Sequence, residues 1–69
     1  METLRNLRLE AGLSQNALAK LARVDRLTVD RAENGQPVQD TKAYAIVQAL
    51  SQALGRQLNM DDVEGLNIL

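Results

Sequence analysis

A short stretch of the sequence carries side chains that could contact the edges of DNA base pairs. Arg26 and Arg31 could each donate two hydrogen bonds to a guanine, and Asp30 could accept one from the amino group of a cytosine. Leu27 or Thr28 could touch the methyl group of a thymine. Two arginines on one helix face usually do no more than contact solvent. The interpretation therefore depends on how the chain positions these five side chains.

A second group of polar residues precedes this stretch and could bind phosphate. Ser14, Gln15 and Asn16 stand at the predicted start of a helix, where backbone N–H groups lack partners and attract anions. Lys20 and Arg23 follow in the same segment, and each is as well suited to a solvent contact as to a phosphate contact. The prediction is a phosphate-binding group beside a base-contacting group.

Several classes of chemistry lack the residues that they need. The 69 residues include no His and no Cys, so a histidine base, a thiol nucleophile, a disulfide and the common zinc ligands are all missing. We expect no enzyme activity, no metal and no cofactor. No stretch is long and apolar enough to span a membrane, and we expect a cytoplasmic protein.

The charge balance is unusual for a protein that contacts nucleic acid. The formal net charge is −1, whereas such proteins usually carry a positive excess. Residues 1–35 hold six basic side chains against five acidic ones, and the remaining residues hold two against four. Any positive surface is therefore modest and lies in the first half of the chain.

The elements that must position these residues are predicted to be helices. The apolar residues are mainly Leu and Ala, which favour helices, and aromatic residues are almost absent. Apolar spacing and capping residues predict helices over 2–10, 15–22 and 26–33, with Ser14 and Asp25 as N-caps. Asn34-Gly35 and then Pro37 end the third helix.

Two more helices are predicted in the second half of the chain. Asp40 or Thr41 caps a long fourth helix that Gly55 ends, and Asn59 caps a short fifth helix through Asp61, Asp62 and Val63. We expect an all-α fold, a five-helix bundle that forms one domain over residues 1–69.

The second and third predicted helices are joined by only three residues, Arg23 to Asp25. This connection is too short for antiparallel packing, so the helices should meet at a steep angle, as in a helix-turn-helix. Val24 should fill the corner, while Val29 and Ala32 bury the back of the third helix and leave its front free.

The segments "LRNLRLEAGLSQNALAKLARV" and "DRLTVDRAENG" resemble the Cro/C1-type (XRE family) helix-turn-helix domain of phage repressors and bacterial regulators. The later segment "LGRQLNMDDVEGL" resembles the fifth-helix region of the same lambda-repressor-like family, so the resemblance covers about residues 4–63. The matching positions are Leu4, Leu7, Arg8, Gly12, Leu13, Ser14, Gln15, Leu18, Ala19, Val24, Val29, Glu33, Asn34 and Gly35.

The resemblance implies a transcription regulator, most simply a repressor that acts by occupying its operator on double-stranded DNA. It implies a homodimer on a near-palindromic site whose half-sites lie about one helical turn apart. Gln15 and Asn34 would hold phosphates, while Arg26, Leu27 and Arg31 would face bases. The resemblance also suggests that Glu33 packs structurally, pairing with Arg8.

Three departures from the family pattern affect these expectations. Arg23 stands where the family usually has Gly, so the turn is strained or adjusted, and the side chain could instead reach a phosphate. Ala22 is smaller than usual, which suggests that Leu21 or Leu9 fills the core. Asp25 and Asp30 put negative charge near the expected phosphates, so we expect modest affinity from one domain.

Two alternatives to an operator-binding regulator remain at this stage. The same fold could be a protein-interaction module that binds a toxin, a polymerase subunit or a phage protein through exposed Leu9, Leu21 and Leu27. It could also package DNA with little sequence preference. The C-terminal apolar residues either fold back on the bundle or form a dimer or partner surface; these residues are Met60, Val63, Leu66, Ile68 and Leu69.

Overall fold

Four α-helices form the body of the computed structural model, which describes residues 2–69. In chain order the elements are β1 (Glu2–Thr3), α1 (Leu4–Glu10), α2 (Gln15–Ala22), α3 (Arg26–Glu33), α4 (Asp40–Leu54), the 3₁₀ turn η1 (Met60–Asp62) and β2 (Val63–Glu64). The mainly helical architecture agrees with the all-α prediction, but the predicted number of five helices is wrong.

The first three helices begin where a side-chain oxygen accepts a hydrogen bond from the first turn. Thr3, Ser14 and Asp25 accept from the backbone N–H groups of Asn6, Ala17 and Thr28 respectively. These caps satisfy amides that the helix leaves without partners. The predicted bounds of α2 and α3 are confirmed, whereas α1 begins two residues later than predicted because Glu2 and Thr3 form β1.

The start of α4 differs from the prediction that Asp40 or Thr41 caps it. Gln39 is the N-cap residue, and Asp40 is the first helical residue. The preceding Val38 is held extended because its N–H donates to the carbonyl of Asn67 and its carbonyl accepts from the N–H of Leu69. The extended backbone therefore continues to Gln39, and the Asp40 carboxylate accepts from the N–H of Thr41 instead.

The predicted fifth helix is a single 3₁₀ turn. The backbone N–H of Asp62 donates to the carbonyl of Asn59, which closes the turn, and the Asp62 carboxylate accepts from the backbone N–H of Asn59. The helix cannot continue because Val63 and Glu64 pair in parallel with Glu2 and Thr3. This short sheet joins the beginning and the end of the described chain.

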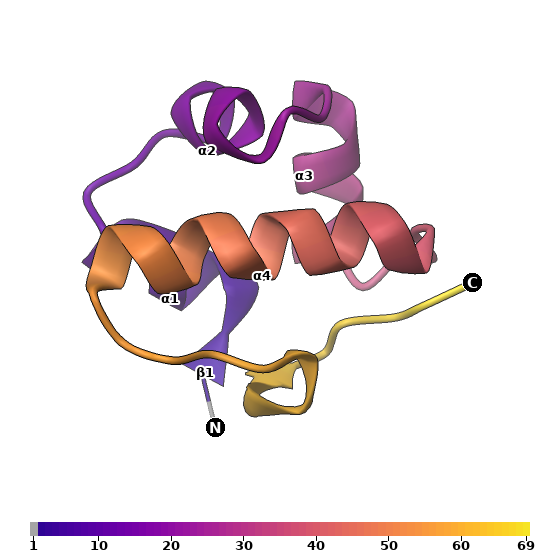
Figure 1. Ribbon diagram of the computed structural model, residues 1–69. Helices are drawn as coiled ribbons and strands as arrows, with labels where there is room; N and C mark the ends of the chain where they lie inside the picture. Colours follow the sequence, from indigo (N-terminus) through magenta and orange to yellow (C-terminus); the bar gives the residue numbers. More distant parts are fainter. Residues whose placement is uncertain (1) are drawn as a thin grey trace.

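The helices are arranged around α4. In Figure 1, α2 and α3 lie above α4, and the C-terminal segment passes below it. The second helix packs against both α4 and α3, and its buried residues Ala19 and Ala22 have small side chains that allow neighbouring helices to approach closely. Within residues 2–69, no helix combines the length and the apolarity that crossing a membrane requires.

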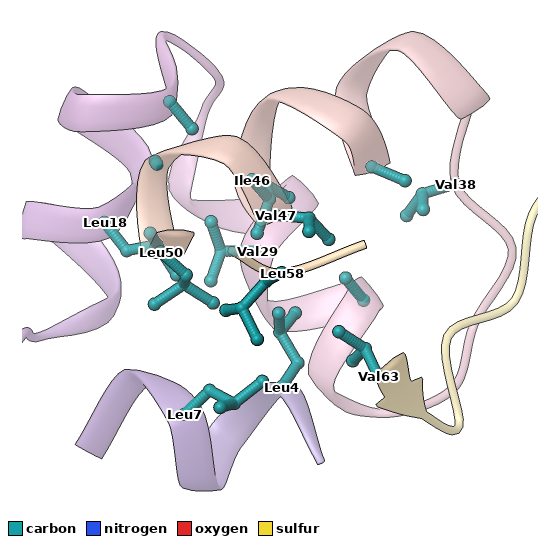
Figure 2. Packing of buried hydrophobic residues seen from close by; sticks show 14 of the residues in the cluster. Leu4, Leu7, Leu18, Val29, Val38, Ile46, Val47, Leu50, Leu58 and Val63 are labelled. Atoms are coloured by element: carbon teal, nitrogen blue, oxygen red, sulfur yellow. The ribbon is translucent and has the colours of Figure 1, made fainter. Parts of the chain in front are cut away.

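The core draws side chains from every helix and from the loop after α4. Figure 2 shows Leu18 beside Leu50, and Val29 and Leu58 on the other side of Leu50, with Leu4 and Leu7 of α1 below them. The prediction that Leu9 or Leu21 fills the space beside Ala22 is wrong, because these two side chains are 55% and 58% exposed. Leu58 and Val63, which follow α4, are buried members of the core.

The C-terminal apolar residues fold back on the bundle. Val63 is buried, and Met60, Leu66 and Ile68 pack partly buried against the core. Leu69 differs from the other four residues, since it is 79% exposed. The prediction that this segment folds back on the bundle is therefore confirmed for four of its five residues.

Candidate nucleic-acid interface

The turn between α2 and α3 is formed by Arg23, Val24 and Asp25. Arg23 ends α2 in the left-handed conformation, with φ 59°, and it is the one non-glycine residue with positive φ among residues 2–69. The N–H of Val24 donates to the carbonyl of Ala19, and its side chain packs against the core as predicted. The chain thus turns sharply into α3, as Figure 1 shows.

The two sides of α3 differ in exposure. Val29 and Ala32 are buried against the core, while Arg26, Leu27 and Arg31 are exposed. The buried face fixes the helix on the bundle, and the exposed face presents two guanidinium groups and one apolar side chain to solvent. Three of the five predicted base-contacting residues therefore share an accessible surface.

Thr28 does not lie on that surface, contrary to the sequence expectation of a free front face. Its side chain is only 8% exposed, and its hydroxyl donates to the carboxylate of Asp25. The N–H of Thr28 donates to the same carboxylate oxygen. Thr28 occupies the third position of the helix, where a side chain turns back to the N-cap residue.

These contacts also set the ionisation of Asp25. The hydrogen bond from the Thr28 hydroxyl, followed by the Thr28 N–H and the positive charge of Lys42, lowers the pKa of Asp25 from its ordinary value. Asp25 therefore stays charged at neutral pH and adds negative charge at the start of α3. The nearby Lys42 partly offsets that charge.

Asp30 faces α2 and not open solvent. It is half-buried, and its Oδ1 accepts a hydrogen bond of 3.3 Å from Nε2 of Gln15. Gln15 also donates from Nε2 to Oε1 of Glu33 at 3.2 Å, and its Oε1 accepts from Nη1 of Arg26 at 3.3 Å. The structure thus brings together Gln15, predicted to contact phosphate, with Arg26 and Asp30, predicted to contact bases.

Glu33 is anchored from its other side by Arg8, which confirms the predicted pairing. Nη2 of Arg8 donates to Oε1 of Glu33 at 3.2 Å, and Nε donates to Oε2. The two side chains are 10% and 5% exposed. Nη1 of Arg8 donates to the carbonyl of Leu13, so the same guanidinium also holds the loop before α2.

The remaining predicted phosphate ligands are exposed at the edges of this surface. Ser14 and Asn16 lie at the start of α2, and Oγ of Ser14 already caps that helix. Arg23 precedes α3 and Asn34 follows it, so these two side chains flank the helix at opposite ends. The structure does not gather them into one cluster.

Sequence reasoning missed one basic residue next to this surface. Lys42, in the first turn of α4, lines a hollow of about 180 Å³ together with Arg31 and Thr28 of α3. The hollow is closed by the segment Pro37 to Gln39 and by Leu69. Nothing local in the sequence indicates that α4 begins beside α3, although Lys42 is one of only two basic residues after residue 35.

Two short helices joined by a sharp turn, with the second helix buried on one side and exposed on the other, define a helix-turn-helix domain. Comparison with protein families matches residues 2–62 to the family described as "Helix-turn-helix domain". The chain belongs to this family, which is of the Cro/C1 (XRE) type. No match was found to a curated protein or to a solved structure.

Membership of this family indicates a DNA-binding regulator, and DNA-binding families of this type are typically non-enzymatic. The resemblance stated from the sequence is thereby confirmed.

Proposed function

We propose that this protein is a sequence-specific transcriptional regulator that represses by occupying an operator as a homodimer. The observation that carries the proposal is the exposed face of α3, with Arg26, Leu27 and Arg31 on a helix whose opposite side is buried by Val29 and Ala32. A helix presented in this way fits the major groove, where arginine donates two hydrogen bonds to guanine.

Exposed polar side chains at both ends of this surface support the same orientation. Ser14 and Asn16 at the start of α2, Arg23 in the turn and Asn34 after α3 can each donate to a backbone phosphate. Asp25 and Asp30 lie between these residues and weaken the attraction. A single domain should therefore bind modestly, and a dimer on two half-sites about 34 Å apart should supply the affinity of a regulator.

Selection of bound duplexes from a randomised pool tests the proposal. We expect enrichment of a short inverted repeat, and an affinity that falls steeply between about 50 and 200 mM salt because phosphate contacts release counterions. Arg31→Ala should relax the selection at one base position of each half-site. Arg56→Ala is the matched control, since Arg56 instead pairs with Glu2 and Glu10.

Two results would count against the proposal. One is a pool without any enriched sequence at low salt. The other is an equal effect of Arg31→Ala and Arg56→Ala on base selection, which would mean that only overall charge matters. Sedimentation of the complex with the selected duplex measures whether two chains bind together.

A protein-interaction module is the second candidate function. The observation that favours it is the exposure of Leu9 and Leu21, which lie on helices outside the α3 surface. Leu21→Ser should weaken binding of a protein partner and leave DNA selection unchanged. Loss of DNA selection in this variant would instead assign Leu21 to the DNA complex.

A further inference from the structure

A second hollow lies where the first turns of α4 meet η1. It has a volume of about 350 Å³ and is lined by Asp40, Thr41 and Tyr44 of α4 and by Met60 of η1. Positions 40 and 44 lie one turn apart on the same face of α4. The turn η1 contacts α4 and lies below it in Figure 1. Two elements that are distant in the sequence therefore form this surface together.

Tyr44 and Met60 give the hollow an apolar lining. Tyr44 is the one aromatic residue of the chain, and it is 57% exposed instead of being placed in the core. A tyrosine ring offers a large, rigid contact area, and such residues are enriched where proteins bind one another. The side chain of Met60 packs partly buried against the core, and methionine adapts readily to the shape of a partner. The hollow is therefore suited to an apolar side chain.

The border of the hollow carries negative charge. Asp40 lines the hollow, and Asp61 and Asp62 follow Met60 directly; all three carboxylates belong to exposed residues and are here called the acidic rim. No ion pair within residues 2–69 involves any of the three. Lys42, the one basic residue of α4, lines the other hollow, beside α3. The acidic rim therefore attracts an occupant that carries positive charge.

This charge distinguishes among the possible occupants of the hollow. A second copy that docks through the same face in a two-fold dimer would place carboxylates against carboxylates. DNA and anionic membrane surfaces would be repelled in the same way, because both present phosphates. A basic protein segment has the opposite charge, and it can also supply the apolar side chain that the hollow accepts.

We propose that the hollow between Tyr44 and Met60 is a docking site for a basic segment of another protein. An apolar side chain of that segment packs against the Tyr44 ring, and flanking Lys or Arg side chains pair with the acidic rim. Lys42 marks the side of α4 next to α3, and positions 40 and 44 lie about 200° around the helix from it. A segment bound here therefore leaves the exposed face of α3 open, so the inference goes beyond the proposed function and does not depend on it.

Selection from a library of random peptides displayed on phage, with the full chain as the target, is the first test. We expect enriched peptides that place an apolar residue between Lys or Arg residues. Their affinity should fall with rising salt, because the acidic rim is exposed to solvent. A selection that enriches no peptide, or that enriches acidic peptides, overturns the inference.

Variants locate the peptide on the surface. Tyr44→Ala should weaken binding of the best peptide about tenfold or more. The double variant Asp40→Asn with Asp61→Asn should weaken binding and also reduce its salt dependence; at position 40, Asn keeps an oxygen that can accept from the N–H of Thr41. Leu21→Ala is the matched control, since Leu21 is 58% exposed and lies on α2. If Leu21→Ala weakens the peptide and Tyr44→Ala does not, the peptide binds elsewhere and the inference is wrong.

Tyr44 also provides a direct signal, because the chain has no Trp and no other Tyr. Titration with an enriched peptide that lacks aromatic residues should change the tyrosine fluorescence of the protein. Unchanged fluorescence at saturating peptide overturns the inference, because the ring would then lie outside the contact.

Two further measurements separate this site from the other surfaces of the molecule. A labelled peptide should bind equally well with and without a selected DNA duplex; displacement by the duplex would place the peptide on the α3 surface and overturn the inference. In sedimentation, a free protein that is dimeric and becomes monomeric in Tyr44→Ala would assign the hollow to a second copy, which also overturns it. A protein that binds the peptide through Tyr44 but selects no DNA sequence supports the inference and contradicts the proposed function.

Discussion

Individual residues determine how the α3 surface is anchored to the rest of the molecule. The ion pair of Arg8 and Glu33 is almost fully buried, and its charges are satisfied by each other, by the Leu13 carbonyl and by Gln15. A buried pair of this kind adds little net stability compared with apolar residues, but the loss of one partner leaves a desolvated charge. The ion pair therefore fixes three parts of the molecule in one arrangement: α1, α3 and the loop that precedes α2.

We expect Arg8→Ala to lower the free energy of unfolding by about 3–5 kcal/mol, because the Glu33 carboxylate stays buried without its cation. Urea denaturation measures the loss. The double variant Arg8→Met with Glu33→Leu should recover much of it, since neither charge remains. Arg56→Ala, which breaks two exposed pairs, should cost below about 1 kcal/mol. Equal losses in Arg8→Ala and Arg56→Ala would contradict this account of the buried pair.

Arg23 combines a strained backbone with an exposed basic side chain. Glycine adopts the left-handed conformation without the Cβ penalty, so Arg23→Gly should change the free energy of unfolding by at most about 1 kcal/mol, toward higher stability. If Arg23 contacts a phosphate, the same variant should bind DNA less tightly, with a salt dependence about one unit shallower. Thermal unfolding and a salt titration measure the two effects. Unchanged salt dependence would remove Arg23 from the DNA contacts.

At the scale of elements, α3 depends on the hydrogen bonds at its first turn. The Asp25 carboxylate accepts from both the N–H and the hydroxyl of Thr28, and these bonds require the ionised form. They hold the pKa of Asp25 below its ordinary value, so the folded state binds the proton less readily than the unfolded state. The stabilisation is complete above the ordinary carboxyl pKa and disappears as the pH falls through the lowered one.

Asp25→Asn tests this dependence, because Asn is also a good N-cap and does not titrate. We expect the wild type to lose stability relative to Asp25→Asn as the pH is lowered from about 5 to about 2. Urea unfolding of both proteins over this range gives the difference directly. Thr28→Val removes the hydroxyl that is the main cause of the lowered pKa, so the pH dependence should be smaller in that background. A constant difference at all pH values would mean that the cap contributes equally in both charge states.

The helices were predictable because their signals are local. Ser14 and Asp25 mark the starts of α2 and α3, and Gly55 marks the end of α4 within a few residues of sequence. The burial of Thr28 was also accessible from spacing, since Thr28 lies four residues before Ala32 and therefore on the same helix face.

The elements that the sequence did not predict depend on partners far along the chain. β1 and β2 are two residues each and pair across nearly the whole sequence, which leaves no periodic pattern. Val38 is held by Asn67 and Leu69, so it moves the start of α4 in a way that local capping rules cannot anticipate. The contacts of Gln15 were missed for the same reason, because they need α2 and α3 in place.

For the whole molecule, the segment after α4 is part of the core. A domain of this size has a free energy of unfolding of roughly 3–10 kcal/mol, at about 0.05–0.15 kcal/mol per residue. Leu58 and Val63 bury their side chains among residues of the helices, and β2 joins the C-terminal segment to β1. Because the margin is small, these contacts should decide whether the helix-turn-helix stays folded.

Leu58→Ala provides the test at this scale. Leu58 lies outside any helix but is only 7% exposed, so its truncation should leave a cavity beneath α4 and cost about 2–5 kcal/mol, a large share of the total. The loss should appear in one unfolding transition, and DNA binding should weaken in parallel as folded protein is depleted. Leu69→Ala is the control, since that exposed leucine should change the free energy of unfolding by less than about 0.5 kcal/mol. A small effect of Leu58→Ala, or a separate early transition, would mean that the four helices are stable without the segment that follows them.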